Sequence, residues 1–167
     1  YPRKELTDHI LKEDNLALAT MRQIAGTKQT CVVMLTKTVM TDRAMYSTNG
    51  TPYLFPLYLY NDNIQSDLEE QPIRSPNLNR EIVDKIAQTI SLTFAPIDIL
   101  DYIYAVLHSP NYRESYKEFL KIDFPRVPYP KDAKTFLELG KLGAELRKLH
   151  LLESPKVEQY ITQYPID

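Results

Sequence analysis

Seven polar side chains that can pair with nucleic acid lie in or beside the connections of the N-terminal third of the sequence. Arg, Gln and Asn make bidentate hydrogen bonds with the edges of guanine and adenine, whereas Lys chiefly neutralises phosphates. The candidates for DNA contact are Arg22, Gln23, Lys28, Gln29, Lys37, Arg43 and Asn49. Polar loops and solvated strand faces are the alternative interpretation of the same residues, so the pattern permits DNA contact without establishing it.

Further cations that suit phosphate contact follow in the second half of the chain, although amphipathic helices commonly carry such residues on a solvated face. These are Arg113, Lys117, Lys121 and Lys134. Asp123 lies three residues before Arg126, and we expect the two to pair and fix the local chain. The acidic run at residues 67–70 is interpreted as solvated loop.

Motifs for catalysis are absent from the sequence. It contains no GxxxxGK[ST] or GxGxxG loop for phosphates and no GxSxG turn for a serine nucleophile. The single cysteine, Cys31, lies in an apolar run and is expected to be buried. One Cys and three scattered His cannot form a zinc site. The sequence therefore favours a non-catalytic chain.

The histidines and two acidic residues are each expected to have structural roles. His9 lies in a polar opening segment and is interpreted as solvated, whereas His108 and His150 end predicted helices, where an imidazolium interacts favourably with the helix dipole. Asp98 and Asp101 lie near a predicted helix start and are expected to interact with the opposite end of the dipole.

Strand patterns occupy the first 60 residues. Residues 15–20 alternate, residues 30–36 form a β-branched apolar run, and Asn49-Gly50 is typical of a type I′ hairpin turn. Residues 53–60 read as one strand, and Pro56 places it at an edge or bulge because proline cannot donate to a ladder.

Helical periods follow a loop predicted at residues 61–80. One helix would bury Ile82, Val83, Ile86 and Ile90 on a single face. Others would begin at Pro96 and Pro110, and a last one would be capped by Asp132. Residues 124–130 contain three prolines and predict an extended connector packed on the helices. Gly140 and Gly143 indicate close approach of another backbone to the last helix.

Composition agrees with a folded α+β chain. The 167 residues carry 20 basic and 22 acidic side chains, a net charge of −2, which excludes a uniformly basic nucleic-acid coat protein but not a basic patch. No apolar run is long enough to span a bilayer. We expect a single domain with a β-rich lobe at 1–60, a loop at 61–80, a helical lobe at 81–152 and a truncated tail at 153–167.

Two stretches of the second half resemble the C-terminal specificity domain of Type ISP restriction-modification enzymes. They are residues 101–114, DYIYAVLHSPNYRE, and residues 119–130, FLKIDFPRVPYP. The resemblance extends back through residues 55–60 and 22–23, and forward through residues 146–151. In that family one long polypeptide carries a nuclease, an ATP-driven translocase, an N6-adenine methyltransferase and a terminal target-recognition domain. The family's Asn-Pro-Pro-Tyr methyltransferase motif is missing here, and the chain stops where the family continues.

The resemblance implies a target-recognition domain that binds double-stranded DNA and positions it for the adjacent methyltransferase domain of the same polypeptide. It implies no cofactor for this chain, since S-adenosylmethionine, ATP and Mg would serve the rest of the enzyme. A cytoplasmic location is expected. A protein-interaction module that packs on the methyltransferase without base readout is the alternative, and a small independent enzyme is a third interpretation.

Overall fold

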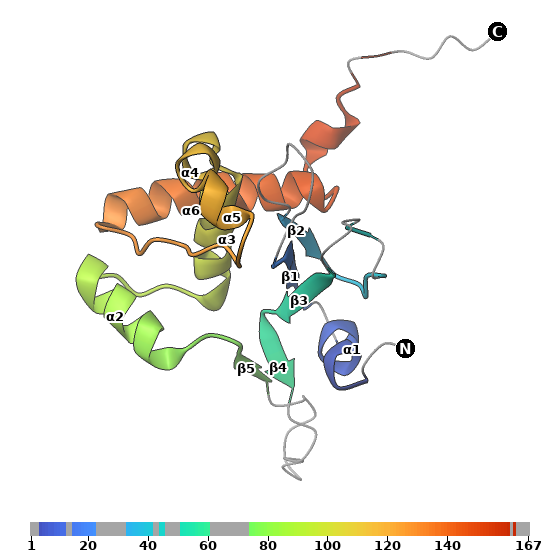
Figure 1. The fold of residues 1–167 in the computed structure, drawn as a ribbon, viewed down its shortest axis with the longest axis horizontal. Helices are drawn as coiled ribbons and strands as arrows, with labels where there is room; N and C mark the ends of the chain where they lie inside the picture. Colours follow the sequence, from blue (N-terminus) through green and yellow to red (C-terminus); the bar gives the residue numbers. More distant parts are fainter. Residues whose placement is uncertain are drawn as a thin grey trace, which may run out of the picture.

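The computed structural model describes residues 4–12, 15–22, 33–41, 44–45, 51–60, 74–160 and 162. Their elements, in chain order, are α1 (Lys4–Leu11), β1 (Ala17–Met21), β2 (Val33–Thr36), β3 (Pro52–Pro56), β4 (Tyr58–Tyr60), β5 (Arg74–Pro76), α2 (Arg80–Ile90), α3 (Pro96–His108), α4 (Pro110–Ser115), α5 (Lys117–Leu120), α6 (Ala133–His150) and a short 3₁₀ helix (Pro155–Glu158). Figure 1 shows the strands and α1 on one side and helices α2 to α5 on the other, with α6 running across both. The predicted α+β class is confirmed.

The strand β1 forms the centre of a three-stranded antiparallel sheet of order β2-β1-β3. Its alternating side chains bury both faces: Leu18 packs against the helix-side core, whereas Ala19 and Met21 belong to a smaller cluster with Met45. Pro56 ends the edge strand β3, opposite Ala17. The edge position predicted from Pro56 is therefore confirmed.

The single strand predicted over residues 53–60 is wrong, because the chain divides at Leu57 into β3 and β4. Leu57 turns aside, donating its N–H to Leu16 O (2.7 Å) and accepting at its carbonyl from Asn77 N (2.8 Å). Beyond this point β4 pairs with β5 in a separate two-stranded sheet. A proline without an N–H ends the first ladder here, which lets the chain change sheets.

Two further elements occupy segments predicted to be irregular. The strand β5 falls inside the loop predicted at 61–80, and its three residues are all exposed, so no hydrophobic alternation marked it. The helix α1 replaces the polar opening segment. It buries Ile10, and the His9 ring accepts a hydrogen bond from Tyr60 N at Nδ1 (3.0 Å), so His9 is an anchor rather than a solvated side chain. The predicted hairpin at 49–50 lies outside the described residues.

The helix α3 forms the centre of the core. It is apolar around most of its circumference and buries eight of its residues, among them Tyr104 and Leu107. Phe136 of α6 packs against Tyr102 with ring centroids 5.5 Å apart. On α2, Ile86 and Ile90 are buried as predicted, whereas Ile82, in the first turn, is 40% exposed.

The helix α6 crosses α3 at Gly143, where the two backbones come into direct contact (Figure 1). A Cβ atom on Gly143 would lie 1.8 Å from the carbonyl oxygen of Asp101, so only glycine fits. One turn further along α6, Arg147 donates from Nε and Nη2 to the two carboxylate oxygens of Asp101, at 2.7 and 3.0 Å. The close approach predicted for Gly143 is confirmed.

The role predicted for Asp101 is wrong. Its side chain is 6% exposed and faces α6 rather than the start of α3. A buried carboxylate requires a charged, hydrogen-bonded partner, and Arg147 supplies both with a bidentate contact. Asp98 does act at the helix start, because its Oδ2 accepts from Ala95 N (2.7 Å).

The connector over residues 124–130 is irregular, as its prolines predict, and it packs on the helices. Tyr102 Oη donates to Pro128 O (3.0 Å), Tyr112 Oη donates to Arg126 O (2.8 Å), and Val127 joins the core. Asp132 then caps α6 by accepting from Thr135 N (2.7 Å), which confirms the predicted cap.

Replacing Gly143 with alanine should destabilise the chain by about 2–3 kcal/mol, since overpacking at a rigid backbone contact forces the two helices apart. Gly140→Ala is the matched control, because the corresponding Cβ meets its nearest atom, Asp98 O, at 4.0 Å. That variant should be neutral or gain up to about 1 kcal/mol from helix propensity. Urea unfolding of the two variants measures the difference, and equal midpoints would contradict the contact.

Candidate nucleic-acid interface

Arg22 directly follows the last residue of the central strand β1, so the strand fixes the position of the Arg22 backbone. The side chain is 59% exposed, and its Nε donates to Asp123 Oδ1 at 3.0 Å. The ion pair predicted between Asp123 and Arg126 is therefore wrong. Arg126 instead places its guanidinium 5.0 Å from the centre of the Phe119 ring.

Lys37 directly follows β2 and pairs through Nζ with Glu153 Oε1 at 2.7 Å. Because β2 runs antiparallel to β1 and Thr36 lies opposite Ala17, Lys37 and Arg22 lie at opposite ends of this strand pair. Lys37 therefore lies at the level of Leu16, six residues from Arg22, and at about 3.4 Å per residue the two are roughly 20 Å apart along the strands. The structure therefore does not bring the two side chains together, although one duplex is long enough to contact both.

The other five predicted DNA contacts lie outside the described residues. They are Gln23, Lys28, Gln29, Arg43 and Asn49. Cys31 and the acidic run at residues 67–70 also lie outside them.

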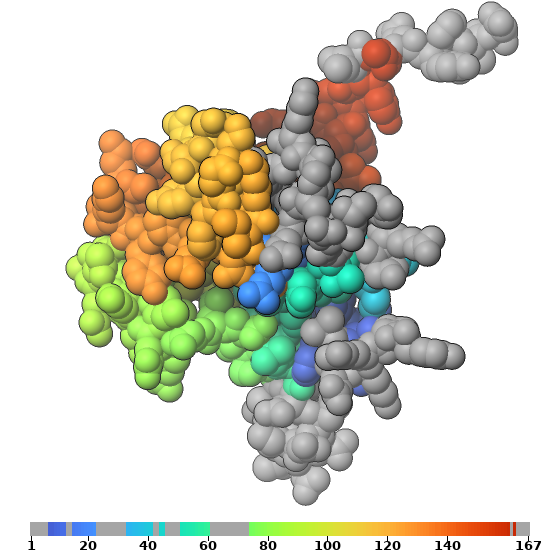
Figure 2. Space-filling view, viewed as in Figure 1, coloured from blue at the N-terminus to red at the C-terminus, as the bar shows by residue number. Residues whose placement is uncertain are grey.

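Aromatic side chains meet at Phe124, the residue that follows Asp123 of the Arg22–Asp123 ion pair. Tyr53 and Phe55 on β3 are 44% and 43% exposed, and both meet the ring of Phe124 edge-on, with centroids 5.1 and 5.9 Å apart. We call Arg22, Tyr53, Phe55, Asp123 and Phe124 the seam cluster. In Figure 2 the blue end of the β1 segment reaches the surface between the strand β3 and the segment that follows α5.

Sequence reasoning missed four of the five residues of the seam cluster. The five residues of the cluster come from three segments that are distant in sequence, and only the packing of the connector against β3 brings them together. The exposed aromatic positions on an edge strand were a usable signal, because large apolar side chains on a solvated face indicate a binding surface.

The cations of the helices are already engaged by neighbouring groups. Arg113 donates from Nε to Leu107 O (2.7 Å) and approaches His108 Nδ1 with Nη2 (3.2 Å), so it supports the end of α3. The lysines at 117, 121 and 134 each lie within 4 Å of a glutamate on the same or the adjoining helix. Exposed pairs of this kind exchange readily with phosphate.

The two histidines at the helix ends, His108 and His150, meet beside the buried side chain of Tyr104. Tyr104 Oη hydrogen-bonds to His150 Nδ1, and the His108 ring packs 4.4 Å from the Tyr104 ring. Burial, followed by the neighbouring Arg113 and His150, lowers the pKa of His108 to about 4. Burial also raises the pKa of Tyr104 to about 12. His108 is thus neutral at pH 7, and the imidazolium predicted at this helix end is wrong.

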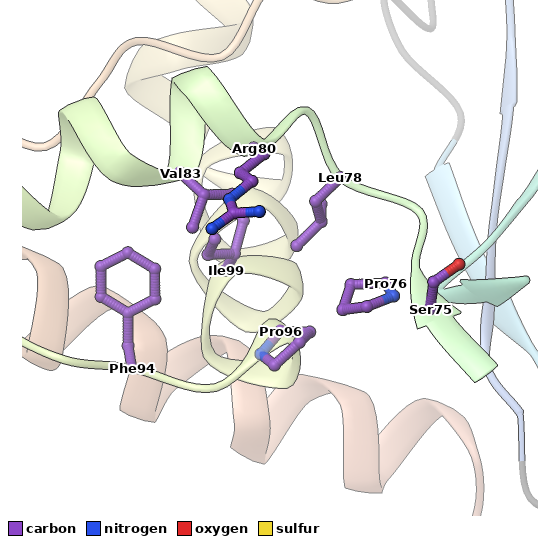
Figure 3. A pocket seen from close by; sticks show the side chains of 8 residues that line it. All are labelled: Ser75, Pro76, Leu78, Arg80, Val83, Phe94, Pro96 and Ile99. Atoms are coloured by element: carbon purple, nitrogen blue, oxygen red, sulfur yellow. The ribbon is translucent and has the colours of Figure 1, made fainter. Parts of the chain in front are cut away.

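An apolar cavity of about 390 Å³ opens between β5, α2 and the start of α3 (Figure 3). Its lining is Ser75, Pro76, Leu78, Arg80, Val83, Phe94, Pro96 and Ile99, so no acid–base pair lines it. Within the described ranges, no three His, Cys, Asp or Glu side chains gather as metal ligands. No helix there is long and apolar enough to cross a membrane.

The fold is similar to parts of proteins whose structures were solved in complex with DNA. The chain matches DrdV in its DNA complex with a TM-score of 0.65 and 25% sequence identity, over 84% of this chain and 12% of that one. It also matches LlaBIII, an ATP-dependent Type ISP restriction-modification enzyme bound to DNA, with a TM-score of 0.60 and 24% identity, over 83% and 8%. The chain thus spans only a small fraction of either protein.

The class to which the chain belongs is that of specificity domains, as its family shows. The family model of the Type ISP C-terminal specificity domain matches residues 1–167, and the chain belongs to that family. The resemblance noted from the sequence is confirmed, and the family description agrees with catalysis by other domains. Comparison with curated proteins finds no match.

His108 should make the chain less stable as the pH falls from 6.5 toward 4. Over this range the unfolded chain takes up a proton that the folded chain excludes, so the free energy of unfolding falls with decreasing pH. We expect a loss on the order of 1–3 kcal/mol, which allows for screening of a half-exposed group. Urea unfolding at pH 7 and pH 4.5 measures it.

The variant His108→Gln should show a smaller pH dependence than the original chain, because its side chain does not titrate. The acidic groups titrate in both proteins, so the difference between the two curves isolates His108. Parallel curves would contradict a buried neutral imidazole.

Proposed function

We propose that this chain recognises a short target sequence in double-stranded DNA for a larger restriction-modification polypeptide. It would position the duplex for an adjacent N6-adenine methyltransferase domain, in the cytoplasm. The observation that carries the proposal is family membership over the whole chain, together with a fold match to DrdV in its DNA complex. An exposed arginine directly after the central strand β1 is a side chain suited to base contact.

Arg22 and Lys37 would have different roles in binding the duplex. Arg22 is the candidate for base readout, because a guanidinium can make two parallel hydrogen bonds to one base. Lys37 is the candidate for phosphate contact, because an ammonium attracts phosphate without sequence preference. Gln23, Lys28, Gln29, Arg43 and Asn49 remain candidates for the same interface.

A protein-interaction module is the second candidate function, and the exposed rings of Tyr53 and Phe55 favour it. In that case the seam cluster would pack on the methyltransferase and DNA contact would be incidental. The two functions differ in their salt dependence, since phosphate contacts weaken steeply with salt whereas apolar packing does not.

The test uses the full-length polypeptide that carries this chain. Its target is first read from the positions of N6-methyladenine in DNA from a host without other methyltransferases. Affinities for target and scrambled duplexes are then measured by fluorescence anisotropy across a salt series. Recognition predicts steep salt dependence and tighter binding of the target, whereas equal and salt-insensitive affinities would favour the interaction module.

Arg22→Ala should lose about 1–3 kcal/mol of discrimination between target and scrambled duplex, the value of one bidentate base contact. Lys37→Gln should instead weaken binding to both duplexes alike. It should also lower the slope of log affinity against log salt concentration by about one unit. Lys156→Gln is the control, because that lysine also forms an exposed ion pair, with Glu145. If Arg22→Ala keeps full discrimination, the reading surface lies elsewhere on the chain.

A further inference from the structure

We propose that Asp123 is a positioning residue, which holds the guanidinium of Arg22 for bidentate hydrogen bonding to a guanine of the target duplex. The inference rests on the proposed function. It adds the identity of the base that Arg22 reads and the residue that orients Arg22 for that contact.

The hydrogen bond between the two side chains uses only one edge of the guanidinium. A guanidinium carries five N–H donors in a planar fork, and Asp123 takes the one on Nε. Nη1 and Nη2 have no hydrogen-bond partner among the described residues. Two parallel donors at the end of an arginine match O6 and N7 of guanine in the major groove, which are both acceptors. Adenine presents a donor in place of O6, so the same fork discriminates against it.

Asp123 is itself held in place by the chain around it. The backbone N–H of Phe124, followed by Arg22, holds the pKa of the Asp123 carboxyl below its ordinary value, so the carboxylate is charged at neutral pH. The ring of Phe124 is fixed between Tyr53 and Phe55 of β3. The residue that orients Arg22 is therefore attached to the sheet that bears Arg22.

The connector beyond Phe124 is anchored to the helices as well. Tyr102 and Tyr112 bind its backbone carbonyls at Pro128 and Arg126. A side chain supported in this way loses less conformational freedom when it meets its ligand than a free arginine does. An arginine held at one edge and open at the other is preorganised for a planar ligand.

A purely structural role is the competing interpretation of the same ion pair, because it links β1 to a residue 101 positions away. Both side chains are partly exposed, at 59% and 35%, and exposed ion pairs add little to stability. Orientation of Arg22 is thus the better account of the pair, and the two interpretations predict different measurements.

The experiment uses the full-length polypeptide and its mapped methylation target. The variants are Asp123→Ala, Asp123→Asn, Arg22→Ala and the double variant. Each is assayed for methylation of duplexes in which one base pair of the target is changed at a time. Asp123→Ala should relax selectivity at least tenfold at one G·C pair, the same pair as for Arg22→Ala. The double variant should be no worse than Arg22→Ala alone.

Asp84→Ala is the matched control, since Asp84 forms an exposed ion pair with Arg80 on α2, 3.9 Å apart. It should leave selectivity unchanged within twofold at every position. Asp123→Asn keeps an oxygen acceptor for Nε and should fall between the original enzyme and Asp123→Ala. It also provides a folded variant if the alanine substitution reduces yield.

A charge-exchanged variant, Arg22→Asp with Asp123→Arg, separates orientation from stability. It can reform the ion pair and restore the melting temperature. The guanidinium then lies on the connector, so selectivity at the G·C pair should stay lost. Recovery of selectivity together with stability would overturn the proposal.

The failures of the two proposals are distinguishable. If the original enzyme discriminates its target and Asp123→Ala does so equally well, Asp123 does not position a base-reading residue, although the proposed function stands. If relaxation occurs only at A·T pairs, the guanine assignment is wrong. If the original enzyme binds target and scrambled duplexes alike, the proposed function fails, and this inference fails with it.

Discussion

The contact between α3 and α6 at Gly143 is the constraint on which the rest of the structure depends. Because glycine has no side chain, the α6 backbone can contact the backbone of Asp101. One turn further along α6, Arg147 neutralises the buried Asp101 carboxylate. Breaking such a pair leaves an uncompensated buried charge, which costs several kcal/mol. The helices can therefore meet in one register, and that register determines where every segment attached to α3 can lie.

The connector that carries Asp123 depends on this arrangement. Tyr102 of α3 and Tyr112 of α4 bind its carbonyls, which holds the connector against the helices and directs Phe124 toward β3. The seam cluster therefore lies where the sheet and the helices meet. A surface built at such a junction keeps its geometry only while the sheet and the helices keep their relative positions.

The buried polar groups of the helices differ from the exposed ion pairs in how readily they can exchange partners. The Asp101–Arg147 pair and the group of Tyr104, His108 and His150 lie within the helices, where burial lowers the pKa of His108 and raises that of Tyr104. The Arg22–Asp123 and Lys37–Glu153 pairs are exposed, and solvent screens them. Exposed pairs can exchange partners with a polyanion at low cost, whereas buried pairs cannot.

Residues with strong local preferences allowed much of the secondary structure to be predicted from the sequence alone. Proline and capping residues marked the starts of α3, α4 and α6, Pro56 marked an edge strand, and the absence of catalytic motifs agreed with a specificity domain. Only the tertiary structure decided the partners: Asp101 meets Arg147, Asp123 meets Arg22 rather than Arg126, and residues 53–60 divide between two sheets. Helix caps and prolines act within a few residues, so a sequence displays them. Partners 46 and 101 positions apart are chosen by how whole elements pack, which no local pattern encodes.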